Sequence, residues 1–231
     1  MSRLFHLLLL LSLCFIGCNS ENSGTQEETE KTETQVIEEK MDNNRKILFY
    51  GNSLTYGYGL TDRSKAFPYL IQARIDSLGM NYDVVNQGES GATSADGLSN
   101  LSWVLQSKYD VMVLALGAND GLRGIDPALT RKNIQEMIDI ARTKYPEIQI
   151  VLAGMKAPPN MGSTFTMAFE TLFPELAMIN QTALIPFLLE GVAGEPNLNL
   201  PDGIHPNPEG HIIVAENVWR TLGRLLEPGE S

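Results

Sequence analysis

The sequence predicts an α/β protein built on one parallel sheet with helices on both faces. Between residues 45 and 227, five short apolar runs alternate with longer segments of helical periodicity. This alternation is typical of βα units, whose strands lie parallel. Because the crossover connections are right-handed, the helices cover both faces of the sheet. No internal repeat or second domain boundary interrupts the pattern, so we expect residues 45–227 to form one domain.

Each predicted strand is short, apolar and followed by small or polar residues. The first, KILFY, ends at Gly51. The third, DVMVLAL, is apolar almost throughout, as expected of a strand that is buried on both faces. The five strands are expected at residues 46–50, 82–85, 110–116, 149–152 and 183–187.

The predicted helices have apolar residues three or four positions apart and recognisable ends. The first stops at Gly79, and the third starts with Asp126 as its N-cap and Pro127 in its first turn. Pro174 is expected to interrupt the fourth. The five helices are expected at residues 68–78, 94–106, 127–144, 165–180 and 208–226.

The composition excludes several classes of protein. Hydrophobic residues make up 43% and charged residues 19% of the 231 residues, which is ordinary for a globular protein and argues against a mainly disordered chain. A net charge of −11 argues against nucleic-acid binding. Two cysteines are too few for a disulfide scaffold or a four-thiolate zinc site, and neither a P-loop motif nor HExxH occurs. We therefore expect no cofactor and no metal.

The N-terminus has the composition of an export signal. Arg3 precedes an apolar run over residues 4–16, which is shorter than the roughly 20 residues of a spanning helix and fits the core of a secretory signal. The segment FIGC at its end resembles a bacterial lipobox. It predicts a signal peptide over residues 1–18, lipidation at Cys18 and a membrane-anchored lipoprotein that faces the periplasm or the cell surface. The alternative is a plain signal peptide or an uncleaved anchor.

Residues 19–44 are mostly polar and acidic, and they contain no aromatic residue. Such a segment buries too little apolar surface to fold, so we expect a disordered, solvated tether. Acidic residues soon after a lipidated cysteine resemble the surface-export signals of some Gram-negative lipoproteins, and the alternative is a plain spacer. Residues 228–231 form a short tail.

Small and polar residues follow several of the strands, where parallel sheets bind their ligands. Four blocks stand out, namely GNSL at 51–54, NQGESGAT at 86–93, GAND at 117–120 and DGIHP at 202–206. Each lies at a strand end or in a loop beyond one. Because these ends meet at one edge of the sheet, we expect the blocks to lie close together.

Ser53 in the first block and His205 in the last are candidates for a nucleophile and its base. A serine hydroxyl needs a base to remove its proton, and histidine is the usual one. His205 lies among prolines that stiffen its loop, whereas His211 lies in the closing helix and is expected to pack or to face solvent. Asp202, three residues before His205, is placed to accept the proton of its Nδ1.

Negative charge that develops on a carbonyl oxygen needs preorganised donors. The candidates are the backbone N–H groups of Ser53 and Gly91 and the side-chain amide of Asn119, and a glycine leaves room for the substrate. Taken alone, Ser53 is better explained as a helix cap than as a nucleophile. Gly91 and Asn119 are also explained by a turn and a cap, and Asp202 with His205 by a surface turn or half a metal site. The occurrence of four blocks at different strand ends favours catalysis.

In order and residues, the four blocks resemble those of the SGNH/GDSL hydrolase superfamily. GANDGLRG at 117–124 and DGIHPN at 202–207 are similar to its branch of bacterial multifunctional acyl thioesterases, arylesterases and lysophospholipases. The resemblance implies a flavodoxin-like, three-layer α/β/α sandwich. The residue roles it implies are Ser53 as nucleophile, His205 as base, Asp202 as its partner, and Ser53, Gly91 and Asn119 as oxyanion donors.

One residue departs from the family pattern. Asn52 stands where the family usually has aspartate. Both side chains can brace a turn by hydrogen bonding, so we expect the placement of Ser53 to be preserved.

The predicted function is hydrolysis of carboxylic esters through an acyl-enzyme. Short acyl or aryl esters and lysophospholipids are the expected substrates, with thioesters incidental. Two alternatives are a carbohydrate O-deacetylase of the same superfamily and a non-catalytic envelope lipoprotein that binds acyl ligands. The segment MKAPPNMGSTFTM at 155–167 suggests an apolar substrate pocket, although simple packing under a long loop explains it equally well. The residues assigned to this pocket are Leu122, Met155, Pro158 and Phe165.

Overall fold

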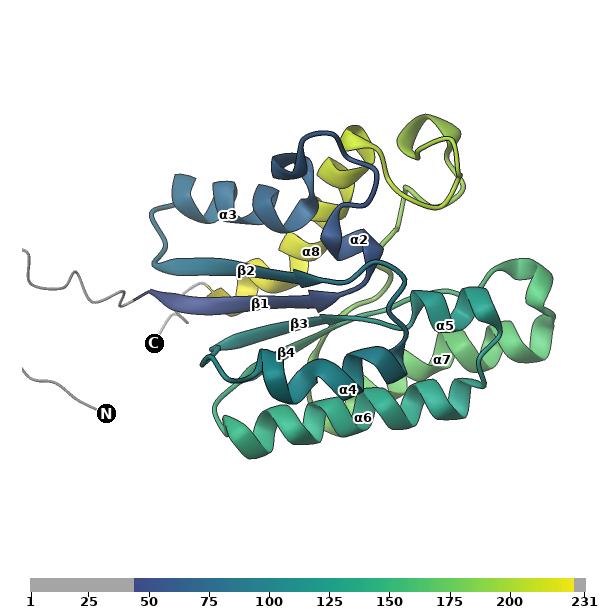
Figure 1. Ribbon diagram of the computed structural model, residues 1–231, viewed down its shortest axis with the longest axis horizontal. Coiled ribbons are helices and arrows are strands. Elements are labelled where there is room, and N and C mark those ends of the chain that lie inside the picture. The colour runs from purple at the N-terminus through teal and green to yellow at the C-terminus, as the bar shows by residue number, and fades with distance from the viewer. Residues whose placement is uncertain (1–43, 227–231) are drawn as a thin grey trace, which may run out of the picture. The chain divides into compact units, whose positions relative to one another are not determined.

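The computed structural model describes residues 44–226, and its centre is a five-stranded sheet (Figure 1). All neighbouring strands pair in parallel, in the order β2-β1-β3-β4-β5. This is the flavodoxin-like order, so the predicted fold is confirmed. The strands are β1 (Arg45–Gly51), β2 (Tyr82–Gly88), β3 (Val111–Ala115), β4 (Gln149–Ala153) and β5 (Ala183–Ile185).

Helices cover both faces of the sheet, which gives the three predicted layers. One face carries α3 (Phe67–Ser77) and α8 (Pro208–Leu226) (Figure 1). The other face carries α4 (Ser94–Val104), α6 (Pro127–Lys144) and α7 (Ser163–Asn180). Two short helices, α2 (Ser53–Tyr56) and α5 (Ala118–Arg123), follow the carboxyl ends of β1 and β3, at the right of Figure 1. Short 3-10 turns lie at Arg63–Lys65, Pro159–Met161 and Pro196–Leu198.

The central strands are buried because helices pack on both of their sides. Every residue of β3 is buried, and so is the apolar centre of β1. Phe49 of β1 packs edge-on against Phe67 of α3, with ring centroids 5.6 Å apart. Burial of one such side chain stabilises the fold by about 1.5–3 kcal/mol. The sheet is therefore a firm platform for the loops at its carboxyl edge.

Side chains fix the N-termini of the helices that follow these loops. Asp126 accepts a hydrogen bond from the N–H of Ala128 at 2.9 Å and Pro127 follows it, as predicted for α6. α4 begins with a capping box, in which Thr93 and Asp96 each accept from the other's backbone N–H. This box holds the end of the β2–α4 loop in place.

Two strands differ from the prediction by more than one residue at one end, and the other strand ends agree to within one residue. β2 continues through residues 86–88, which pair with residues 49–51 of β1 instead of starting a loop. β5 ends at Ile185, two residues early, because Pro186 has no N–H to offer to a strand ladder.

The predicted interruption of the fourth long helix at Pro174 is wrong. α7 is continuous from Ser163 to Asn180. Residues 163–167, at the end of the segment 155–167 expected to line a pocket, therefore belong to this helix. A proline inside a helix costs about 3 kcal/mol. Phe169 and Phe173 beside it are buried, and their packing offsets that cost.

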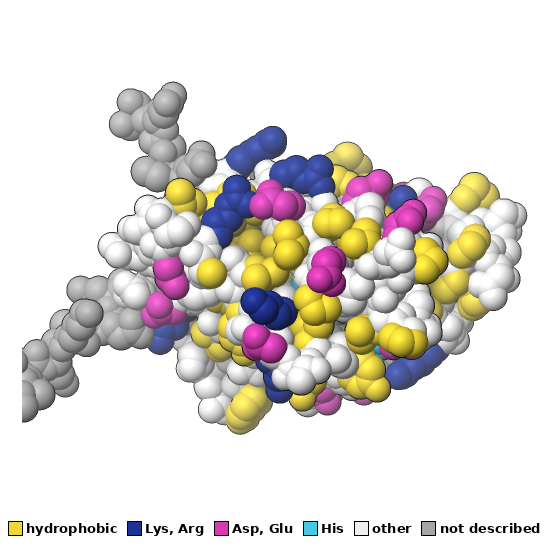
Figure 2. All heavy atoms as spheres, turned by 90° about the horizontal axis from the view of Figure 1, so that it is seen from above, with side chains coloured by type: hydrophobic (Ala, Val, Ile, Leu, Met, Phe, Trp, Pro, Cys, Tyr) yellow, Lys and Arg dark blue, Asp and Glu magenta, His cyan; other side chains and the backbone are white. Residues whose placement is uncertain are grey.

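The surface carries acidic, basic and apolar side chains, which lie interspersed on the face shown in Figure 2. Between residues 44 and 226, no helix combines the length and the apolar character needed to cross a bilayer. The predicted signal peptide with Cys18, the tether up to residue 43 and the tail at 228–231 lie outside the described residues.

Candidate active site

The turn from β1 into α2 presents Ser53 at the carboxyl edge of the sheet. Asn52 is fully buried, and its Oδ1 accepts from the N–H of Leu54 at 3.0 Å, so it caps the helix and braces the turn as expected. Gly51 precedes it because a Cβ at that position would lie 2.0 Å from Oγ1 of Thr55. Ser53 is therefore held as the first residue of α2.

The loop before α8 holds His205 through its own backbone. The N–H of Leu200 donates to the carbonyl of His205 at 2.7 Å and closes the loop. Inside it, Oδ1 of Asp202 accepts from the N–H groups of Ile204 at 2.9 Å and His205 at 3.0 Å. The carboxylate of Asp202 thus organises the turn that carries His205.

Ser53, His205 and Asp202 form a hydrogen-bonded chain of side chains. Nε2 of His205 lies 2.9 Å from Oγ of Ser53, and Nδ1 lies 2.7 Å from Oδ2 of Asp202. Desolvation opposes ionisation of Asp202, but hydrogen bonds from the backbone of His205 and Ile204 and from the His205 ring lower its pKa to about 2. The anionic carboxylate favours the proton on Nδ1, so Nε2 faces Ser53 as an acceptor.

Gly91 lies in the loop after β2, and Asn119 lies in α5, directly after β3. Gly91 has φ of +84°, which favours glycine, and a Cβ there would meet only Nη2 of Arg123 within 4 Å, at 3.7 Å. The same Nη2 donates to the carbonyl of Gly91 at 2.9 Å. Nδ2 of Asn119 donates to the carbonyl of Ala92 at 2.9 Å, which leaves its second N–H for another acceptor. Two side chains of α5 therefore hold the Gly91 loop.

Asp120 is a buried carboxylate that belongs to the GAND block but has no predicted role. It accepts from the N–H of Ser94 at 2.8 Å, from the Ser94 hydroxyl at 2.5 Å and from the Thr130 hydroxyl at 3.1 Å. Asn133 also donates to the Ser94 hydroxyl, at 2.9 Å. Because these residues belong to α4, α5 and α6, the network joins the starts of three helices. Its place directly after Asn119 is the signal that could have revealed it.

Tyr58 and His211 are two further residues near the His205 loop. The rings of Tyr58 and His205 have centroids 4.6 Å apart at an angle of 42°. His211 packs in the interior, one of its two predicted outcomes, and its Nδ1 accepts from the N–H of Phe67 at 3.2 Å. Burial, with a smaller effect of His205, lowers the pKa of His211 to about 4. His211 is thus a neutral structural acceptor.

The residues predicted to line an acyl pocket occupy different environments. Met155 is buried in the core, whereas Leu122 is exposed on α5. Pro158 and Phe165 are half-buried, and Phe165 stacks on Phe169 within α7 with ring centroids 5.9 Å apart. Their contact with a substrate stays a prediction.

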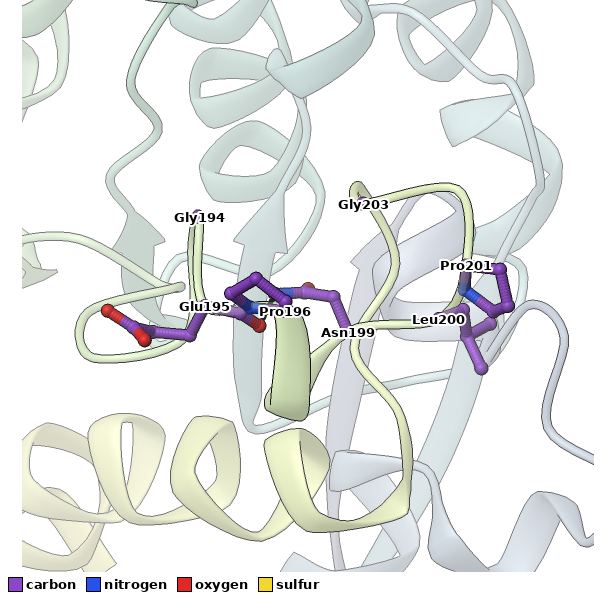
Figure 3. Close-up of a pocket in the computed structure, with 7 residues that line it drawn as sticks. All are labelled: Gly194, Glu195, Pro196, Asn199, Leu200, Pro201 and Gly203. Carbon is purple, nitrogen blue, oxygen red and sulfur yellow. Dashed lines mark hydrogen bonds between the residues drawn. The ribbon is translucent and has the colours of Figure 1, made fainter.

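A hollow of about 320 Å³ lies beside the loop that carries Asp202 (Figure 3). Ser53 and His205 are not among its lining residues, so it is separate from the hydrogen-bonded chain. Within residues 44–226, no cluster of three His, Cys, Asp or Glu side chains is placed to hold a metal. The lining residues are Gly194, Glu195, Pro196, Asn199, Leu200, Pro201 and Gly203.

Known proteins are similar in sequence to this chain over most of its length. The profile of the GDSL-like lipase/acylhydrolase family matches residues 49–213. Esterase TesA of Pseudomonas aeruginosa is 40% identical over 181 residues, which are 78% of this chain and 89% of that protein. An arylesterase of Vibrio mimicus is 35% identical over 78% of this chain and 90% of its own length. The Escherichia coli protein named thioesterase 1/protease 1/lysophospholipase L1 is 33% identical over 79% of this chain and 83% of its own length.

Solved structures share the fold as well. The crystal structure of TesA covers 79% of this chain and 100% of its own, with 39% identity and a TM-score of 0.75. AlinE4, an SGNH-hydrolase family esterase, covers 80% of this chain and 98% of its own, with 34% identity and a TM-score of 0.65. The chain therefore belongs to the GDSL-like lipase/acylhydrolase family and is a carboxylic ester hydrolase.

Proposed function

We propose that Ser53 is the nucleophile of this ester hydrolase, with His205 as general base and Asp202 as the partner of His205. The supporting observation is the chain of hydrogen bonds from Asp202 through His205 to Ser53, with lengths of 2.7 and 2.9 Å. As Oγ of Ser53 bonds to the carbonyl carbon of the ester, its proton passes to Nε2 of His205. Asp202 stabilises the imidazolium that forms.

We assign three donors to the oxyanion. The N–H of Ser53 opens α2, so it has no acceptor within that helix. The N–H of Gly91, in the loop after β2, and the second amide N–H of Asn119, in α5 after β3, complete the set. Each such donor contributes about 2.7–4 kcal/mol to stabilisation of the transition state.

The acyl-enzyme then forms and is hydrolysed by the same groups. The bond between the carbonyl carbon and the leaving oxygen breaks, and Nε2 of His205 gives its proton to that oxygen. Water next attacks the acyl carbon and passes a proton to His205. The bond to Ser53 breaks, its Oγ regains the proton, and the acid leaves.

The names of the relatives support the proposed substrates. They are called esterase, arylesterase and thioesterase/lysophospholipase. For this chain we propose short acyl or aryl esters and lysophospholipids, with thioesters incidental because an exported protein meets little acyl-CoA. These names favour neither the carbohydrate O-deacetylase nor the non-catalytic binder of acyl ligands.

Substitution of the nucleophile tests this function. Ser53→Ala is expected to abolish turnover of phenyl acetate and of a lysophospholipid, with the circular dichroism spectrum unchanged. Ser107→Ala, in the exposed loop before β3, is the matched control and should keep full activity. Turnover by Ser53→Ala at near the wild-type rate would reject the assignment.

We also propose that Cys18 carries the lipid that anchors the exported protein in a membrane. Support comes from the sequence alone, in the FIGC segment after the apolar run. Palmitate labelling in a bacterial host should disappear in Cys18→Ala and persist in Cys14→Ala, the matched control. Labelling that survives Cys18→Ala contradicts the anchor.

A further inference from the structure

The ring of Tyr58 lies beside the imidazole of His205. The two ring centroids lie 4.6 Å apart, and the planes meet at 42°. Tyr58 is 48% exposed, whereas the side chain of His205 is 18% exposed. One part of the Tyr58 ring therefore contacts the imidazole, and much of the rest is open to a molecule that approaches from solvent.

The backbone fixes Tyr58 relative to Ser53. α2 ends after one turn at Gly57, which has φ of +79°. The N–H groups of Gly57 and Tyr58 both donate to the carbonyl of Ser53, at 3.0 Å each. Tyr58 is thus hydrogen-bonded directly to the residue that carries the nucleophile.

The turn after Tyr58 also packs against the His205 loop. At Gly59, a Cβ would lie 2.4 Å from Cδ1 of Leu200, so the turn and the loop approach closely. Leu200 is itself tied to His205 by the hydrogen bond of its N–H to the His205 carbonyl. The contact between Tyr58 and His205 is therefore supported from both loops.

The proposed mechanism places the leaving group of the ester beside His205. Nε2 of His205 gives its proton to the leaving oxygen, which requires an approach to about 2.6–3.2 Å. The first atoms beyond that oxygen then lie beside the imidazole, whose ring centroid is 4.6 Å from that of Tyr58. Aromatic rings interact at centroid separations of about 4.5–7 Å. Two of the three proposed oxyanion donors lie on other elements, Gly91 in the loop after β2 and Asn119 in α5.

We infer that Tyr58 is a specificity-determining residue that contacts the leaving group and favours aryl over alkyl leaving groups. The inference rests on the proposed function, because it places the leaving oxygen at His205. A phenol leaving group offers a second ring to the exposed part of Tyr58, and a saturated alcohol does not. Aromatic pairs of this kind favour binding by about twofold to twelvefold beyond area burial.

Two acetates with the same acyl group and different leaving groups test the inference. Phenyl acetate is compared with the acetate of a fluorinated alkyl alcohol about as acidic as phenol, so that the demand for proton transfer is matched. Tyr58→Leu is expected to lower kcat/KM for phenyl acetate by about twofold to twelvefold relative to the alkyl acetate. Tyr58→Phe, which keeps the ring, should retain the wild-type ratio. Tyr69→Leu, which removes an exposed tyrosine of α3, is the control and should also retain it.

The acetyl-enzyme provides the second readout. It is common to both substrates, and its leaving group has already departed, so its hydrolysis rate should be the same in Tyr58→Leu and the wild type. An equal loss for both acetates, or slower hydrolysis of the acetyl-enzyme, would show that Tyr58 only positions His205 and would overturn the inference. An unchanged substrate ratio would overturn it as well. Failure of the proposed function is a separate result, because Ser53→Ala would then still hydrolyse both esters.

Discussion

At the scale of single residues, the proton on Nδ1 of His205 decides whether Nε2 can accept from Ser53. Asp202 holds that proton through a 2.7 Å contact, and its pKa of about 2 keeps it anionic. Because this pKa lies below the ordinary value of 3.8, the carboxylate stabilises the fold above pH 3.8 and loses that contribution as pH falls through about 2. The neutral pH range is therefore far from its titration.

We predict that Asp202→Asn lowers kcat for phenyl acetate by about 10³–10⁴-fold at neutral pH. The amide would donate to Nδ1 and place the proton on Nε2, where it blocks acceptance from Ser53. Steady-state kinetics on a variant with wild-type circular dichroism checks this. A loss of less than about tenfold would mean that Asp202 does not set the tautomer.

Because of the lowered pKa of His211, we predict that the free energy of unfolding decreases at mildly acidic pH. The pKa of the His211 imidazole is about 6.5 in the unfolded chain and about 4 in the folded chain. The neutral, buried imidazole therefore makes its full contribution to the free energy of unfolding above pH 6.5, and this contribution is lost as pH falls towards about 4. This difference between the two pKa values corresponds to about 3 kcal/mol of the free energy of unfolding. Urea unfolding from pH 7 to 4.5 should show a smaller decline in His211→Asn, whose side-chain oxygen can still accept from Phe67. Equal declines in both proteins would contradict the role of His211.

At the scale of elements, Asp120 of α5 joins α4 and α6 through hydrogen bonds from Ser94 and Thr130. Asp120→Ala leaves the buried donors of Ser94 and Thr130 unpaired, at about 1–3 kcal/mol each. We predict a loss of about 3 kcal/mol in the free energy of unfolding, together with a lower kcat because Asn119 adjoins Asp120. The exposed Asp139→Ala should change stability by less than about 0.5 kcal/mol. Similar urea midpoints for the two variants would show that the network contributes little.

The helices and strands also show which of their bounds can be predicted from neighbouring residues alone. Asp126 and Pro127 predict the start of α6 correctly, because capping depends on neighbouring residues alone. Pro174 predicts a break that does not occur, because the packing of Phe169 and Phe173 is a tertiary effect. The extra length of β2 likewise comes from pairing with β1, which periodicity within β2 does not contain.

At the scale of the whole molecule, the parallel sheet explains why so much of the site could be predicted. Ser53 and His205 are 152 residues apart, yet both lie beyond carboxyl strand ends, which one topology brings to one edge. The order of the motifs and the positions of the strands are therefore enough to predict the hydrogen bonds that join Ser53, His205 and Asp202. The contact of Tyr58 with His205 and the network around Asp120 depend on the side-chain directions of neighbouring loops and helices, and these do not follow from strand order.

The central claim is that the hydroxyl of Ser53 is the activated nucleophile, and covalent trapping by a phosphonate tests it most directly. Incubation with a reactive ethylphosphonate, followed by peptide mass mapping, should give one adduct per chain at Ser53. Esterase activity should fall in proportion to labelling. An adduct at another residue, or full activity after complete labelling, would contradict the account.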